Sequence, residues 1–135
     1  MKHIVMAPSG QPLLDGPKLI AAAKERFGPA VRVQPSPPGW DTDFHLYVTL
    51  DGDSLTVSHF ADNGSVSFES SDLPLQEAVA WYRSLLPAEF PRVIACDQGF
   101  NGHVDLHHGI TTDEIADRWV DHGTDGWNAG DPDFG

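Results

Sequence analysis

The fold of this chain is decided by residues 44–69, which read FHLYVTLDGDSLTVSHFADNGSVSFE. Apolar and polar residues alternate through this stretch, as they do in strands that bury one face. Two dipeptides interrupt the alternation, Asp51-Gly52 and Asn63-Gly64. Each of them suits a two-residue turn with positive φ between antiparallel strands. The stretch therefore predicts a three-stranded antiparallel meander.

The register of the meander follows if each dipeptide forms the turn by itself. The predicted cross-strand pairs are Val48 with Leu55, Leu46 with Val57, His59 with Phe68, and Ala61 with Val66. The face expected to be buried consists of Leu46, Val48, Leu50, Leu55, Val57, His59, Ala61, Val66 and Phe68. The opposite, polar face consists of His45, Tyr47, Thr49, Thr56, Ser58, Phe60, Ser65, Ser67 and Glu69.

Capping residues and helical periodicity predict the remaining elements. Asp15 is a suitable N-cap for a helix over residues 16–27, and Gly28-Pro29 ends that helix. Two more helices are predicted, over 73–86 and from the N-cap Thr111 to about Gly123. The other predicted strands cover 2–7, 30–34, 92–97 and 103–107.

Together these elements predict an α+β fold with a mainly antiparallel sheet. The central three-stranded meander 44–69 and a hairpin at 92–108 make up most of the sheet, and two to three helices pack on one face. We expect a single domain over residues 1–123, followed by a flexible acidic tail over 124–135.

Composition restricts where the chain works and what it binds. Its 135 residues can bury a core without disulfides, and Cys96 is the only cysteine. No apolar stretch approaches the roughly 20 residues of a membrane span, and the N-terminus lacks the apolar core of a signal peptide. We therefore expect a cytoplasmic protein that binds no membrane. The residue usage, with few lysines and many Asp, Gly, Pro and Ala, is typical of a GC-rich bacterial genome.

The formal net charge is −12, and it is unevenly distributed. Residues 113–135 contain 7 acidic residues and one basic residue, which gives this short segment a net charge of −6. The chain has no cluster of Lys and Arg, so binding to nucleic acid is not expected. A basic protein is the partner that this charge favours, although the charge could serve solubility alone.

The sequence HVDLHH at 103–108 is the best candidate for metal chemistry. On a strand His103, Asp105 and His107 share one face, and imidazole and carboxylate are ligands for Zn²⁺ or another divalent metal. However, His103 and His107 would be roughly 13 Å apart at Cα. A two-residue site completed by His45 or His122 is geometrically easier, and a polar strand face with hydrogen-bonded histidines is the simpler alternative.

Cys96 is a second candidate. If Asn101-Gly102 forms a two-residue turn, Cys96 lies opposite His107, and a thiol beside an imidazole is the beginning of a nucleophilic site. The alternative is a small core residue. His59 on the buried face of the meander is interpreted in the same way, as a core histidine with a hydrogen-bonded ring.

No catalytic signature, phosphate-binding loop or calcium loop is present, since Asp51-Gly52-Asp53 lacks the remaining ligands of a calcium site. The sequence therefore predicts a small non-enzymatic protein-binding domain, for example an inhibitor or immunity-type partner of a basic protein. The residues expected at the ligand or partner surface are Tyr47, Thr49, Thr56, Ser58, Phe60 and Cys96. The alternative is a metal- or small-ligand-binding protein or hydrolase that uses His103, Asp105, His107 and Cys96. No resident cofactor is predicted apart from that metal, and the oligomeric state stays open.

Overall fold

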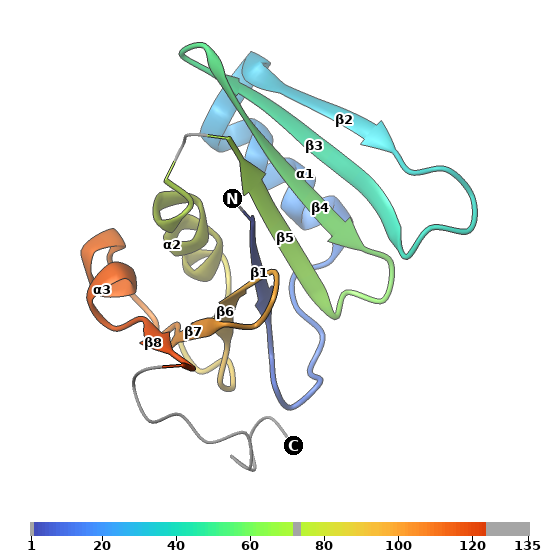
Figure 1. The fold of residues 1–135 in the computed structure, drawn as a ribbon. Coiled ribbons are helices and arrows are strands. Elements are labelled where there is room, and N and C mark those ends of the chain that lie inside the picture. Colours follow the sequence, from blue (N-terminus) through green and yellow to red (C-terminus); the bar gives the residue numbers. More distant parts are fainter. Residues whose placement is uncertain (1, 72–73, 124–135) are drawn as a thin grey trace.

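A computed structural model describes residues 2–71 and 74–123, which form one eight-stranded antiparallel sheet with helices α1 to α3 (Figure 1). The strand order is β2-β3-β4-β5-β1-β6-β7-β8. The strands are β1 Lys2–Met6, β2 Val31–Pro35, β3 Thr42–Leu50, β4 Asp53–Phe60, β5 Ser65–Ser70, β6 Ile94–Asp97, β7 Gly102–Asp105 and β8 Val120–Asp121. The helices are α1 Gly16–Phe27, α2 Gln76–Ser84 and α3 Thr112–Asp117, and a 3₁₀ turn covers Gly28–Ala30.

This architecture confirms the predicted α+β fold, in which a meander and a second hairpin share one sheet and the helices pack on one face. The predicted tail over 124–135 lies outside the described residues. Within residues 2–71 and 74–123, no helix is long and apolar enough to cross a membrane.

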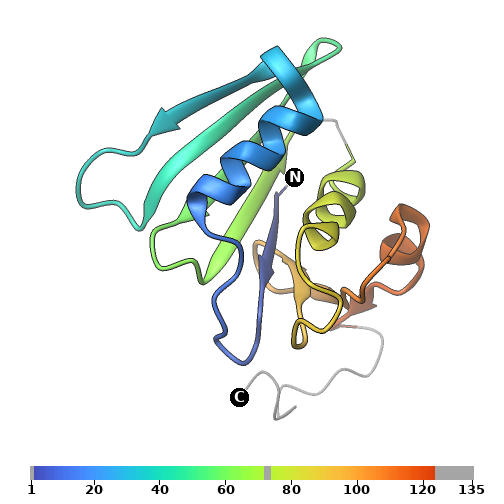
Figure 2. The ribbon, with the colours of Figure 1, turned by 180° about the vertical axis from the view of Figure 1, so that it is seen from behind.

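Helix α1 begins and ends where its capping residues predict. The Asp15 carboxylate accepts a hydrogen bond from the Lys18 amide at 2.9 Å, and Gly28 adopts a positive φ of 60° at the C-cap. Leu19 and Ala23 are buried on the face that contacts the sheet. Figure 2 shows α1 lying across the strands of the meander.

Helix α2 packs on the same face of the sheet as α1. The ring of Tyr82 contacts the ring of Phe68 on β5 edge to face, with 5.7 Å between centroids. The Tyr82 hydroxyl also accepts a hydrogen bond from the amide of Leu14, just before α1, at 3.3 Å. Both helices therefore cover the apolar side of the sheet, and α3 packs against α2.

The first turn of the meander forms as predicted. Asp51 and Gly52 both have positive φ, 42° and 83°, which is the conformation that this dipeptide favours between antiparallel strands. The predicted pairs Val48 with Leu55 and Leu46 with Val57 are observed. The local sequence is sufficient to predict the register of this hairpin, because the turn and the strand residues that it pairs lie within a few residues of each other.

The predicted register of the second turn is wrong by two residues. Val57 pairs with Phe68, and His59 pairs with Val66, so a four-residue connection 61–64 replaces the two-residue turn. The amide of Ala61 donates to the Asp41 carbonyl at 2.9 Å, so Ala61 extends the contact with the β2–β3 connection instead of pairing with Val66. A shift of two residues keeps the paired strand residues on their predicted faces. Ala61, predicted on the buried face, instead lies in the connection and is exposed.

The predicted register of the second hairpin is also wrong. Cys96 pairs with His103 instead of His107. The connection between β6 and β7 is wider than a two-residue turn because Phe100 adopts a positive φ of 51° and the Asp97 carboxylate accepts the Asn101 amide at 2.6 Å. Cys96 and His107 are therefore not cross-strand neighbours.

The last helix is shorter than predicted. The capping box of Thr111 and Glu114 forms as expected, but α3 ends at Asp117. Trp119 follows the helix, and Val120 pairs with His103 as part of the short edge strand β8. The indole of Trp119 lies so close to Gly102 that a Cβ atom there would overlap it. The chain after Asp117 thus pairs with the edge of β7 instead of continuing as a helix.

Candidate functional site

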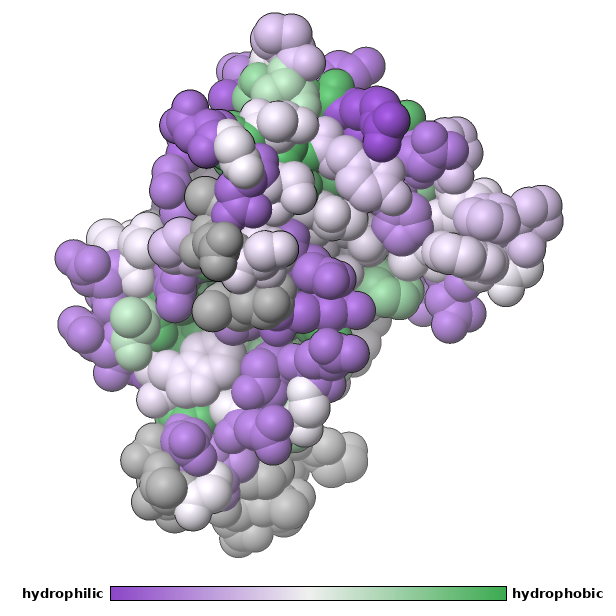
Figure 3. Space-filling model, turned by 45° about the horizontal axis from the view of Figure 1, so that its top comes forward, coloured by the Kyte–Doolittle hydropathy of each residue, from purple (hydrophilic) through white to green (hydrophobic). Residues whose placement is uncertain are grey.

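Within the part of the chain that the structure describes, no helix covers one face of the meander (Figure 1). In Figure 1 no helix lies in front of β2 to β5, and α1 lies behind them. Along β3 and β4 the residues of this face are half-buried or exposed, whereas their neighbours are almost all buried. Figure 3, tilted from the view of Figure 1, shows mainly purple and white residues with scattered green ones. We call this surface of β2–β5 the open face.

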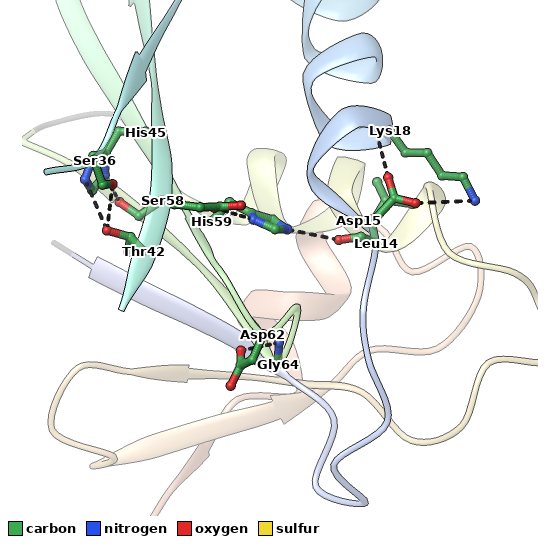
Figure 4. A network of polar contacts seen from close by, with 11 residues as sticks. Leu14, Asp15, Lys18, Ser36, Thr42, His45, Ser58, His59, Asp62 and Gly64 are labelled. Carbon is green, nitrogen blue, oxygen red and sulfur yellow. Dashed lines mark hydrogen bonds and ion pairs between the residues drawn. The ribbon is translucent and has the colours of Figure 1, made fainter. Parts of the chain in front are cut away.

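The open face carries a row of aromatic and polar side chains. The guanidinium of Arg32 on β2 lies 5.0 Å from the centroid of the Tyr47 ring. Next along β3, the Nδ1 atom of His45 lies 2.8 Å from the Ser58 hydroxyl (Figure 4). Trp40 lies edge to face with His45 at 6.0 Å between centroids and is 58% exposed. Among the described residues, Trp40 is the one large hydrophobic side chain that is exposed to solvent.

One end of the open face is hollowed. The hollow has a volume of about 510 Å³ and is lined by Trp40, Asp41, Phe60, Ala61 and Asp62. The two connections that form it are held together by the hydrogen bond from the Ala61 amide to the Asp41 carbonyl. The Asp62 carboxylate accepts the Gly64 amide at 2.7 Å, which fixes the second connection. We call this feature the acidic hollow; it combines two aromatic rings with two carboxylates.

Five of the six residues predicted at the partner surface lie on the open face. They are Tyr47, Thr49, Thr56, Ser58 and Phe60. Cys96 lies elsewhere, buried on β6, where its thiol donates to the Ile4 carbonyl at 3.6 Å. Burial raises the pKa of the Cys96 thiol to about 11, and the nearby Asp97 charge adds to this. A nucleophilic thiol needs the opposite shift.

His103, the first predicted metal ligand, lies next to another histidine. Its Nδ1 atom is 2.7 Å from Nε2 of His122, whose Nδ1 is 2.6 Å from the Phe100 carbonyl. Because that carbonyl can only accept, His122 carries its proton on Nδ1, and its Nε2 accepts from His103. His122 therefore lies against the hairpin, and the two rings are joined by a hydrogen bond.

The other two predicted metal ligands have partners of their own. The Asp105 carboxylate accepts the Arg92 guanidinium at 2.6 Å, and the Nε2 atom of His107 lies 3.0 Å from the Glu114 carboxylate. His45, considered as a further ligand, lies on β3 on the open face. Across residues 2–71 and 74–123, no three His, Cys, Asp or Glu side chains gather as a metal ion would require.

The interaction between His107 and Glu114 also changes the pKa of the Glu114 carboxyl. The hydrogen bond from His107 lowers the pKa of the exposed Glu114 carboxyl, and the bonds from Thr111 contribute in the same direction. Glu114 thereby links the β7–α3 connection to the first turn of α3.

His59 is a buried core residue whose ring makes both a stacking contact and two polar contacts. It is 2% exposed and stacks on Phe44 with 4.9 Å between centroids. Its Nδ1 lies 2.7 Å from the Asp43 carboxylate, and its Nε2 lies 3.2 Å from the Leu14 carbonyl (Figure 4). Both neighbours are acceptors, so a ring that carries both protons satisfies both contacts. No signal in the sequence connects Leu14 with His59.

Two features of the structure were not predicted from the sequence. The position of Trp40 beside Asp41, Phe60 and Asp62 depends on how two separate connections meet. Arg83 is almost fully buried on α2, and helical periodicity gave no reason to expect a buried charge there.

Comparison with protein-family models, with curated proteins and with solved structures finds no match to this chain.

Proposed function

We propose that this chain is a non-enzymatic protein-binding domain that binds a basic partner through the open face of β2–β5. The observation that carries the proposal is the acidic hollow, where the 58% exposed Trp40 ring lies beside Asp41 and Asp62. The expected location is the cytoplasm.

The aromatic side chains supply the apolar part of such an interface. Trp and Tyr are the residues that most often dominate binding energy, because they bury a large area at a small cost in side-chain entropy. Trp40 and Phe60 line the hollow, and Tyr47 lies further along β3 on the same face. Phe60 and Tyr47 belong to strands whose backbone is already hydrogen-bonded in the sheet, so little backbone ordering accompanies binding at these two residues.

The carboxylates determine the charge of the partner. Asp41 and Asp62 both line the hollow, and a Lys or Arg side chain placed there would contact an aromatic face and two negative charges. The net charge of −12 would also accelerate the approach of a basic protein and repel an acidic one. An inhibitor or immunity-type protein that covers a basic effector is the concrete version of this proposal.

The alternative function, an enzyme or ligand-binding protein centred on the second hairpin, has weaker support. Cys96 is buried with a raised pKa, and His107, its expected base, is bonded to Glu114. Neither group is prepared for nucleophilic catalysis.

The proposal is tested with a defined basic probe. An acetylated and amidated Gly-Arg-Gly-Arg-Gly peptide is titrated into ¹⁵N-labelled protein, and a peptide with citrulline in place of Arg serves as the neutral control. We expect the Arg peptide to shift the indole N–H of Trp40 and the amides of β3 and β4, and we expect the effect to fall as salt rises.

A matched pair of variants separates local from global electrostatics. Asp41→Asn/Asp62→Asn removes two charges at the hollow, whereas Asp51→Asn/Asp53→Asn removes two charges at the opposite end of the meander. We expect the first variant to weaken binding several-fold and the second to change it little. Equal effects of both variants, or shifts spread evenly over the chain, would show that the peptide responds only to net charge.

A further inference from the structure

Arg83 on α2 is a buried cation, and among the described residues its side chain donates only to carbonyl groups. The side chain is 2% exposed. Its Nε donates to the Leu106 carbonyl at 3.1 Å, and its Nη1 donates to the carbonyls of Leu86 and Pro87 at 3.3 Å each. Within the described residues no carboxylate forms an ion pair with it, and its Nη2 group has no hydrogen-bond acceptor.

A buried charge without a counter-ion is unusual. Charged side chains that leave water are generally paired, because desolvation penalises the charged form and unsatisfied donors add to the cost. The pKa of Arg83 is accordingly lowered from its ordinary value by burial. The carbonyls at the end of α2 offset part of this cost, as cations do at a helix C-terminus, but they leave Nη2 unsatisfied.

Arg83 lines a hollow of about 430 Å³ on the surface of the molecule. Two segments form the walls, 88–93 and 105–108, and the hydrogen bond from the Leu106 amide to the Val93 carbonyl at 2.8 Å joins them. Arg92, His107 and His108 also line the hollow, together with the Asp105 carboxylate. Three further basic side chains therefore surround the position of Arg83.

We propose that this hollow, with Arg83 at its floor, binds a small oxyanion, the phosphate or carboxylate group of a small molecule. The anion accepts from Nη2 of Arg83, which satisfies the remaining donor and supplies the missing counter-charge. Because Nε and Nη1 are already engaged, Arg83 holds a single oxygen. His108 also lines the hollow and is exposed, and within residues 2–71 and 74–123 its ring makes no hydrogen bond, so it is available as a second contact for the anion.

The acidity of the whole chain does not prevent this binding. The lining carries two guanidinium groups against one carboxylate, Asp105, so its formal charge is +1 even with both histidines neutral. Glu114 contacts His107 from outside the lining, and charges farther away are screened by solvent over about 8 Å at physiological ionic strength. This site is separate from the acidic hollow, which is lined by other residues, so the two proposals stand or fall independently.

The experiment follows the Arg83 side chain directly. The Nε–H of Arg83 is buried and hydrogen-bonded, so its ¹⁵N–¹H signal can be observed while sodium phosphate, sodium acetate or sodium chloride is added at constant ionic strength. We expect a saturable shift with an oxyanion and none with chloride. A response to both oxyanions supports the shared chemistry, and a response to phosphate or acetate alone identifies the group. No saturable shift with either would overturn the proposal.

Variants assign the binding to this hollow. Arg83→Met should reduce the affinity at least tenfold, whereas the same change at the exposed Arg26 on α1 should leave it unchanged. Arg83→Met could fail to fold because three carbonyls lose their donor. In that case His108→Ala tests whether the oxyanion binds in this hollow, since this variant leaves those three bonds intact. We expect His108→Ala to weaken binding several-fold, and unchanged affinity in that variant contradicts the proposed site.

Discussion

The Nδ1 atom of His59 lies 2.7 Å from the Oδ1 atom of Asp43, on the neighbouring strand of the meander. The same imidazole contacts the Leu14 carbonyl through Nε2, so one buried ring connects two strands to the segment that leads into α1. This arrangement makes a histidine on the apolar face of the sheet compatible with burial, because both of its nitrogens are satisfied.

Replacing His59 with Phe should destabilise the protein by about 2 kcal/mol. The aromatic volume is kept, but the Leu14 carbonyl and the Asp43 carboxylate both lose a hydrogen-bond partner. Chemical denaturation measures the effect. His45→Gln, on the open face of the same hairpin, is the matched control and should cost less than about 1 kcal/mol. Equal costs at the two positions would mean that the His59 contacts contribute nothing specific.

Gly16→Ala should destabilise the protein although Ala favours helices. Gly16 is the first residue of α1, and a Cβ atom there would lie 2.8 Å from Cε1 of Phe44. Relieving this overlap requires movement of the Phe44 ring and the His59 ring stacked on it, at a cost of about 1–3 kcal/mol. The melting temperature is the measurement. A variant as stable as the original chain would show that the rings move freely.

Cys96 should react slowly with alkylating reagents. Its thiol is buried and its pKa is raised to about 11, so very little thiolate exists at neutral pH. We expect iodoacetamide to modify native Cys96 far more slowly than the denatured chain, with mass spectrometry as the readout. Native modification at the rate of an exposed thiol would instead support the enzymatic alternative.

Stability should decrease at alkaline pH. The pKa of Cys96 is raised from 9.0 to about 11, and burial raises the pKa of Tyr82 from 10.0 to about 12. Above pH 9 the unfolded chain loses these protons first, so their contribution to stability is full below that pH and is lost as pH rises through the folded pKa values. Cys96→Ala should flatten the first part of the decline in denaturation curves between pH 8 and 11.

The carboxyl of Glu114 should titrate closer to its ordinary value when His107 is removed. The hydrogen bond from His107 is the main cause of its lowered pKa. Any stability that this carboxylate contributes is present above the ordinary pKa of 4.5 and is lost as pH falls through the lower folded value. In His107→Ala, NMR titration of the Glu114 side chain should give a higher pKa. An unchanged value would assign the shift to the capping box of Thr111 alone.

The residues that form the candidate surface were largely predictable. The alternation in β3 and β4 assigned Tyr47, Thr49 and Ser58 to one face, and the structure places them there. Both register errors were shifts by an even number of residues, so they left the faces unchanged. The cross-strand neighbours did change, which removed the expected contact between Cys96 and His107.

The sequence by itself determined the features that arise within a few residues: the Asp51-Gly52 turn, the cap of Asp15, the capping box of Thr111 and the apolar face of the meander. Their causes are local, since steric restrictions on φ, short hydrogen bonds and strand alternation act between neighbours. The tertiary structure alone decided the contacts between distant segments. The bond between His59 and Leu14 spans 45 residues, and the bond between Leu14 and Tyr82 spans 68. The acidic hollow and the environment of the buried Arg83 exist for the same reason, because loops and helices from separate parts of the chain meet there in the folded structure.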